Sequence, residues 1–186
     1  MPITSAEAAA SLHEADTAGR RMRTADAYSA ASGHLILWGA IWFVGYALCG
    51  ILAPLYWGAV WVPLIVVGGL GSGLVGRREA CRAGAMAGRG AAVLTMSAAI
   101  AVFILSVLVV FRPTQPEPSL VLPALVTGLV YTLMGSLVLR RFVWIGAGIF
   151  AATMAGYLFA RPALPFILAV AGGGGLMLGG LWLRRP

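Results

Sequence analysis

Residues 119–160 read SLVLPALVTGLVYTLMGSLVL-RR-FVWIGAGIFAATMAGYLFA, two apolar runs that are separated only by Arg140 and Arg141. Each run is close to the ~20 residues that an α-helix needs to cross a hydrocarbon core about 30 Å thick. A link of two residues makes the consecutive helices lie antiparallel. This stretch therefore predicts a helical hairpin that spans a membrane.

The same pattern fills the chain from residue 34 to residue 183. Hydrophobic residues make up 60% of the 186 residues and charged residues only 10%, whereas a soluble domain has roughly 45–50% and about 25%. We therefore predict an all-α integral membrane protein, an up-and-down bundle of six transmembrane helices. The six apolar runs are 34–53, 56–76, 90–111, 119–139, 142–160 and 163–183.

The arginines predict the orientation of this bundle. All 13 basic residues are arginine, and arginine gathers on the cytoplasmic side of membrane proteins. With a cytoplasmic N-terminus, eleven arginines lie inside and only Arg112 and Arg161 lie outside. We therefore expect residues 1–33 and the tail 184–186 to be cytoplasmic, in the inner membrane of a bacterium. The net charge of +7 then follows from topology and does not indicate nucleic-acid binding. The eleven inner arginines are Arg20, Arg21, Arg23, Arg77, Arg78, Arg82, Arg89, Arg140, Arg141, Arg184 and Arg185.

Residues 1–33 differ from the rest because they hold four of the six acidic residues and few apolar ones. The segment is rich in alanine, and Thr4 with Glu7 has the spacing of a capping box. We predict a short cytoplasmic helix that ends at Gly33. Its charged surface is a candidate docking site for a partner protein.

Three of the predicted helices end alike. Residues 72–78, 135–141 and 179–185 each read small, small, Leu, bulky, any residue, Arg, Arg. This favours three helical hairpins derived from one repeated unit. The alternative is that every helix returning to the cytoplasm needs arginines and small packing residues.

Small residues recur at a spacing of four inside the runs, which lets helix backbones approach closely. We expect such packing ridges at Gly69 and Gly73, at Gly148, Ala152, Gly156 and Ala160, and at Ala171, Gly175 and Gly179. The run Gly172, Gly173, Gly174, Gly175 has a second interpretation. Four glycines weaken a helix by roughly 1 kcal/mol each, and a broken helix exposes backbone groups to a ligand.

No acidic residue falls inside an apolar run, and the two histidines lie outside the core of the bundle. We find no acid–base pair, nucleophile or metal-ligand pattern, and we therefore expect no enzymatic activity, no cofactor and no metal. Neutral hydroxyls remain as the chemistry inside the membrane. Those that share a helix face at a spacing of four, and that are candidates for lining a pore, are Thr127, Tyr131, Thr153 and Tyr157.

Two functions follow as expectations. The first is a non-enzymatic accessory, regulatory or structural subunit, docked through residues 1–33 and bound to anionic lipid headgroups or to a partner by Arg77, Arg78, Arg82 and Arg89. The alternative is a small facilitator or substrate-binding transport component for a neutral or anionic solute, with Arg112 and Arg161 at its outer mouth. A homo-oligomer fits either function.

Overall fold

The computed structural model describes residues 5–83, 87–137 and 140–184, and these parts of the chain contain helices and turns but no strand. The α-helices are α1 (Ser5–Ile51), α2 (Trp57–Ala83), α3 (Ala87–Phe111), α4 (Glu117–Leu137), α5 (Arg141–Phe159), α6 (Leu164–Ile167) and α7 (Gly175–Leu183). Two 3₁₀ turns, η1 (Pro54–Tyr56) and η2 (Arg161–Ala163), precede α2 and α6, and a π-helix, η3 (Leu168–Gly174), joins α6 to α7. We call the continuous helix Leu164–Leu183 the last span.

Five helical segments are long and apolar enough to cross a membrane: Ala27–Ile51, Pro54–Arg77, Glu117–Leu137, Arg141–Phe159 and Arg161–Leu183. They match five of the six predicted runs to within a few residues, except that the first begins earlier. The remaining run, 90–111, corresponds to α3, whose described apolar stretch, Thr95–Phe111, is shorter. The structure thus shows a helical protein compatible with several membrane passes.

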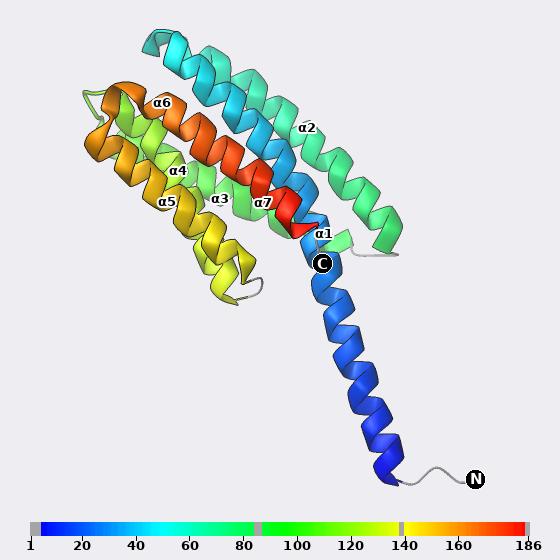
Figure 1. Ribbon diagram of the computed structural model, residues 1–186. Helices are drawn as coiled ribbons and strands as arrows, with labels where there is room; N and C mark the ends of the chain where they lie inside the picture. The colour runs from blue at the N-terminus through cyan, green and yellow to red at the C-terminus, as the bar shows by residue number, and fades with distance from the viewer. Residues whose placement is uncertain (1–4, 84–86, 138–139, 185–186) are drawn as a thin grey trace.

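The helices run up and down between two ends (Figure 1). We call the end that carries Arg77, Arg140, Arg141 and Arg184 the arginine end, and the end with the turns at residues 52–56, 112–116 and 160–163 the opposite end. The last span lies against both α1 and α5, and α4 pairs with α5. The largest fully buried side chains belong to these helices: Ser32, Tyr46, Thr153, Leu164, Leu168 and Leu176.

The prediction that Gly33 ends the first helix is wrong. α1 runs without interruption for 47 residues, and its first 22 residues project beyond the arginine end (Figure 1). At 1.5 Å per residue this projection is roughly 30 Å long. A single glycine inside a helix costs only about 0.5–1 kcal/mol relative to alanine, which the alanine-rich flanks and the packing of the apolar half offset.

Glycines bring α1 and the last span into backbone contact. A Cβ on Gly173 would lie within 2.6 Å of the Cα of Phe43 and 2.8 Å of the carbonyl oxygen of Gly39. One on Gly180 would lie 2.9 Å from the carbonyl oxygen of Ser32. Gly173 and Gly180 are seven residues apart, which is two helical turns. The two helices therefore meet along a seam that only glycine permits.

The α4–α5 pair, which is also extensive, is built in the same way. A Cβ on Gly128 would lie 3.0 Å from the carbonyl oxygen of Gly146, and one on Gly135 would clash with the backbone of Phe142 and Val143. Gly128 and Gly135 are again seven residues apart. A seven-residue repeat keeps one face of a helix against its partner, as in left-handed antiparallel packing.

The small-residue ridges predicted at a spacing of four are right in part. Gly156 packs on Leu164 and Ile167, and Gly179 packs on Ile145. Nothing lies within 4 Å of a Cβ placed on Gly69, Gly73 or Gly148, nor of one placed on Gly175. Gly69 and Gly73 face away from the chain's own helices because α2 packs on α1 with the face that carries Gly68 and Gly71.

α2 and α3 lie at the periphery. α2 packs on α1 through Gly68 and Gly71, and the indole of Trp38 donates a 3.0 Å hydrogen bond to the hydroxyl of Ser72. α3 touches chiefly α4, and only sparsely. The closely packed antiparallel pair of α4 with α5 thus lies across a boundary of the three expected hairpins, and the repeat itself stays a prediction.

The opposite end is closed by aromatic side chains. The indole of Trp57 donates to the carbonyl oxygens of Cys49 and Leu52, at 3.1 and 3.2 Å. It thereby satisfies two of the carbonyls that a helix leaves without partners at its C-terminus. The ring of Tyr46 stands edge-on to Trp42 and to Trp61, with centroids 5.4 and 5.0 Å away. Its buried hydroxyl donates to the carbonyl oxygen of Leu120 and so ties α1 to α4.

Candidate functional site

The glycine run does not break the last span. Residues 172–174 continue the helix as part of the π-helix η3, and Gly175 begins α7. Gly172 faces the ring of Trp42 and Gly173 faces the backbone of α1, whereas Gly174 and Gly175 face open space. The run therefore serves helix packing on one side, and a gap in the helix that would offer backbone groups to a ligand is not formed.

The four hydroxyls that were candidates for lining a pore have different surroundings, and a pore lined by them stays a prediction. Thr153 is 1% exposed and its hydroxyl donates to the carbonyl oxygen of Ile149 at 2.7 Å, within α5. Tyr131 stacks edge-on against Phe142 with centroids 5.5 Å apart. Tyr157 lies under the guanidinium of Arg161, 4.7 Å from its centroid. Thr127 is half-buried on α4.

At the opposite end, the two arginines expected to attract an anion differ in their surroundings. Arg161 is folded back over Tyr157, and its Nε donates to the carbonyl oxygen of that residue at 3.2 Å. Arg112 is exposed and ends α3 with a φ of 39°. Glu117, in the first turn of α4, has a buried Oε2 atom without a hydrogen-bond partner.

A cluster at the arginine end escaped the sequence analysis. The guanidinium of Arg141 lies over the rings of Tyr28 and Trp182, 5.4 and 5.1 Å from their centroids, and its Nη1 donates to the carbonyl oxygen of Trp182 at 3.2 Å. A cation at the C-terminus of a helix is stabilised by the helix dipole and by bonds to the last carbonyls. Arg141, from α5, therefore caps α7 and touches α1.

A second arginine closes the same cluster. Nε of Arg184 donates to the hydroxyl of Ser32 at 3.2 Å, and that hydroxyl donates to the carbonyl oxygen of Ser29 at 2.8 Å. Ser32 is 2% exposed. We call Tyr28, Ser32, Arg141, Trp182 and Arg184 the latch. The paired arginines were visible in the sequence, but their aromatic and hydroxyl partners lie up to 152 positions away along the chain.

The predicted basic docking surface is described only in part. Arg77 is exposed at the arginine end of α2. The side chains of Arg78, Arg82 and Arg89 lie outside the described residues. The prediction that these four bind lipid headgroups or a partner therefore stays a prediction.

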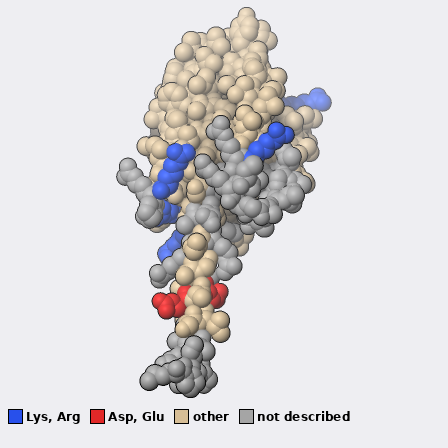
Figure 2. All heavy atoms as spheres, turned by 90° about the vertical axis from the view of Figure 1, so that its right-hand side faces the viewer, with Lys and Arg blue, Asp and Glu red and all other residues tan. Residues whose placement is uncertain are grey.

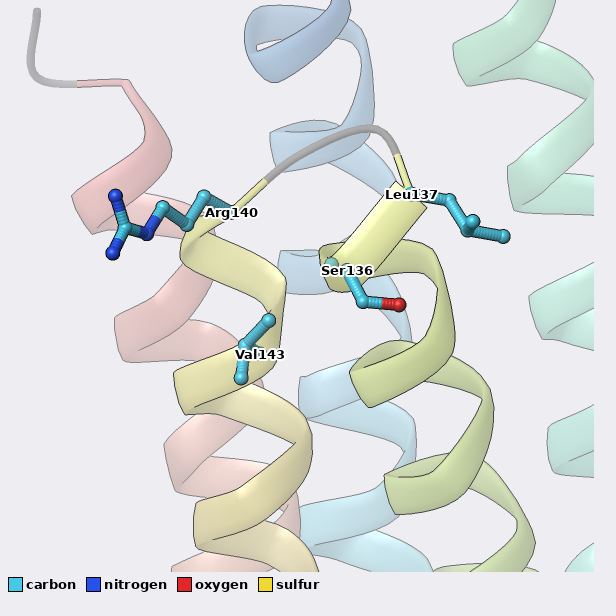
Figure 3. Close-up of a pocket in the computed structure, with 5 residues that line it drawn as sticks. Ser136, Leu137, Arg140 and Val143 are labelled. Atoms are coloured by element: carbon cyan, nitrogen blue, oxygen red, sulfur yellow. The ribbon is translucent and has the colours of Figure 1, made fainter.

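The structure shows a shallow hollow beside the α4–α5 turn, of about 320 Å³, lined by Gly135, Ser136, Leu137, Arg140 and Val143. In Figure 3 the side chain of Arg140 extends away from Ser136 and Leu137, so the polar groups do not converge. The hydroxyl of Ser136 is bonded to the carbonyl oxygen of Leu133 at 2.8 Å. This hollow has none of the converging polar groups that are typical of a small-molecule site.

The projecting part of α1 carries exposed apolar and acidic side chains. Leu12 and Met22 are 72% and 69% exposed, and Glu14 and Asp16 are exposed on the same helix. Figure 2 shows acidic side chains on the projection and arginine side chains on the bundle. Among the described residues, no three His, Cys, Asp or Glu side chains are grouped to hold a metal ion.

No protein-family model, curated protein or solved structure matches the chain. The candidate functional surface is therefore defined by the structure alone. It consists of the projecting residues 5–26 of α1 and the latch at their base.

Proposed function

We propose that this protein is a non-enzymatic accessory or regulatory subunit of the inner membrane, with six transmembrane helices and both ends in the cytoplasm. In this topology α3 is the third span, and the arginine end faces the cytoplasm. The observation that carries the proposal is the projection of α1, which extends roughly 30 Å beyond the bundle as a continuous helix.

The charge along the projection separates into two zones. Residues 5–19 hold Glu7, Glu14 and Asp16 and no arginine, whereas Arg20, Arg21 and Arg23 follow nearer to the bundle. Arginines near a membrane surface gain roughly 1 kcal/mol each from anionic headgroups. The acidic zone lies beyond them, at a distance where it meets proteins instead of lipid. We propose a partner with a basic surface for this acidic zone, since complementary charge steers association.

Anionic lipid headgroups are the second proposed partner. Arg77, Arg78, Arg82 and Arg89 lie at the arginine end of α2 and in the segment that follows it. In the proposed topology this is the cytoplasmic leaflet, which carries the negative surface charge. A homo-oligomer is compatible with this arrangement, because α2 leaves Gly69 and Gly73 facing open space.

The alternative, a facilitator for a neutral or anionic solute, has less support. The hydroxyl of Thr153 bonds within α5, and Gly173 of the glycine run packs against the backbone of α1. Arg161 at the proposed outer mouth is engaged with Tyr157. None of these groups lines the hollow that the structure shows.

The experiment is affinity purification of the full chain in mild detergent, followed by mass spectrometry. The test variant is Glu14→Gln with Asp16→Asn, which removes the acidic zone's described charges, and the matched control is Ser11→Ala on the same exposed segment. The proposal expects a stoichiometric protein that is retained by the control and lost from the double variant. A chain that purifies alone with a bound small molecule contradicts it and supports the facilitator.

A further inference from the structure

The last span changes its helix type in the middle of the bundle. α6 gives way to the π-helix η3 over seven residues, and α7 resumes the α-helix at Gly175. A row of buried residues with a constant spacing of four follows this segment: Leu164, Leu168, Gly172, Leu176 and Gly180. In an α-helix with 3.6 residues per turn, such a row turns by roughly 40° at each step.

A π-helix forms i→i+5 hydrogen bonds and has a little over four residues per turn. With about 4.4 residues per turn, residues four apart within η3 fall short of a full turn by roughly 30°. This deviation is opposite to that of the α-helical steps and offsets it, so the whole row stays buried. The π-helix thus sets the rotation of α7 relative to α6. π-helical segments of this kind are rare and occur preferentially at functional sites.

We infer that η3 is a register switch, in which α7 alternates between the present π-register and an α-register. Converting η3 to α-helix shifts α7 by about one residue, which is a rotation of roughly 100° and a translation of about 1.5 Å. Each position on α7 is then taken by the preceding residue. This inference concerns motion inside the bundle and does not depend on the proposed partner.

The sequence at the seam with α1 accepts both registers. Gly180 now lies against the backbone of Ser32, and in the α-register Gly179 takes its place. Closer to the middle, Gly173 lies against Phe43 and is preceded by Gly172. The close helix contact therefore keeps a glycine in either register. The conversion of η3 to an α-helix also meets no obstacle on the face that carries Gly174 and Gly175, since nothing lies within 4 Å of a Cβ placed on either residue.

Two sets of contacts oppose the switch. One lies on the face of α7 that packs on α5, and the other lies at the C-terminal end of α7. In the α-register Leu178 replaces Gly179 against Ile145, a contact where a Cβ already comes within 2.7 Å. The latch is disrupted as well, because Arg141 bonds to the carbonyl oxygen of Trp182 and Arg184 to the hydroxyl of Ser32. The latch therefore holds the present register, and loosening it releases the switch.

The test measures distances between spin labels in the full chain in lipid nanodiscs, in a Cys49→Ala, Cys81→Ala background. One label pair is Leu178→Cys with Leu129→Cys, both at exposed positions, and it reports the rotation of α7. The matched control pair is Phe166→Cys with Leu129→Cys, which reports α6, before the π-helix. A rotation of about 100° moves a side chain by roughly 5–8 Å.

The switch predicts two distance populations for the pair at 178 and one for the pair at 166. Deleting Gly174 restores the α-helix while leaving α7 in its present place, so the pair at 178 then shows the present distance alone. Arg141→Gln removes the bond to Trp182 and raises the second population by about fivefold. A single population for both pairs, unchanged by Arg141→Gln, overturns the inference.

Discussion

Gly173→Ala is the substitution that tests the packing of the bundle most sharply. The added Cβ would lie 2.6 Å from the Cα of Phe43 and 2.8 Å from the carbonyl oxygen of Gly39. Ordinary contacts of this kind are at least about 3.5 Å, so α1 and the last span must separate by nearly 1 Å. Both obstacles are backbone atoms, which cannot turn aside as a side chain can.

Two contributions of opposite sign determine how much Gly173→Ala changes the free energy of unfolding. Overfilling a packed core costs about 1–3 kcal/mol, and here the upper part of that range applies because helix backbones must move. Replacing glycine with alanine inside a helix contributes about 1 kcal/mol in favour of folding. The net loss in the free energy of unfolding is therefore about 2 kcal/mol, and the folded-to-unfolded ratio falls by roughly 30-fold.

The matched control is Gly174→Ala, in the same glycine run, where nothing lies within 4 Å of the new Cβ. This control keeps the favourable propensity term and has no clash, so its stability equals or exceeds that of the parent. The assay is reversible unfolding in mixed micelles followed by tryptophan fluorescence. Equal stability of the two variants would refute the seam between α1 and the last span.

Two further substitutions probe single hydrogen bonds. Tyr46→Phe removes the hydroxyl that donates to the carbonyl oxygen of Leu120. This substitution is expected to lower the free energy of unfolding by about 0.6–1 kcal/mol. If the same unfolding assay shows no change, the carbonyl oxygen of Leu120 has found another donor. Trp57→Phe removes the indole that donates to the carbonyl oxygens of Cys49 and Leu52. We expect faster hydrogen exchange of the backbone amides in the last turn of α1, measured by mass spectrometry. An unchanged exchange rate would contradict the capping role of Trp57.

Much of the architecture could be predicted because it rests on length and composition. Apolar runs of about 20 residues predicted the membrane-compatible helices, and the two-residue link at Arg140 and Arg141 predicted the antiparallel pair α4–α5. The end of the first helix was missed because a glycine such as Gly33 penalises a helix only slightly. Local propensity cannot tell whether the residues on both sides hold the helix together.

The helix seams and the latch could be predicted only in part, for a different reason. A small residue shows that close packing is permitted but not which face is packed, so ridges were predicted alike at Gly73, which faces open space, and at Gly156, which packs. The spacing of seven was the better signal, since it repeats one face over two turns. The latch joins α1, α5 and α7, and its partners meet only after the helices have packed.

The central claim is that the acidic projection of α1 lies in the cytoplasm, where a partner can dock on it. Cysteine accessibility tests this directly in a Cys49→Ala, Cys81→Ala background, with Leu12→Cys on the projection and Gln115→Cys in the exposed turn at the opposite end. A membrane-impermeant maleimide is applied to intact and to permeabilised cells. The account predicts that Gln115→Cys is labelled in intact cells and Leu12→Cys only after permeabilisation. Labelling of Leu12→Cys in intact cells would place the projection outside and contradict the account.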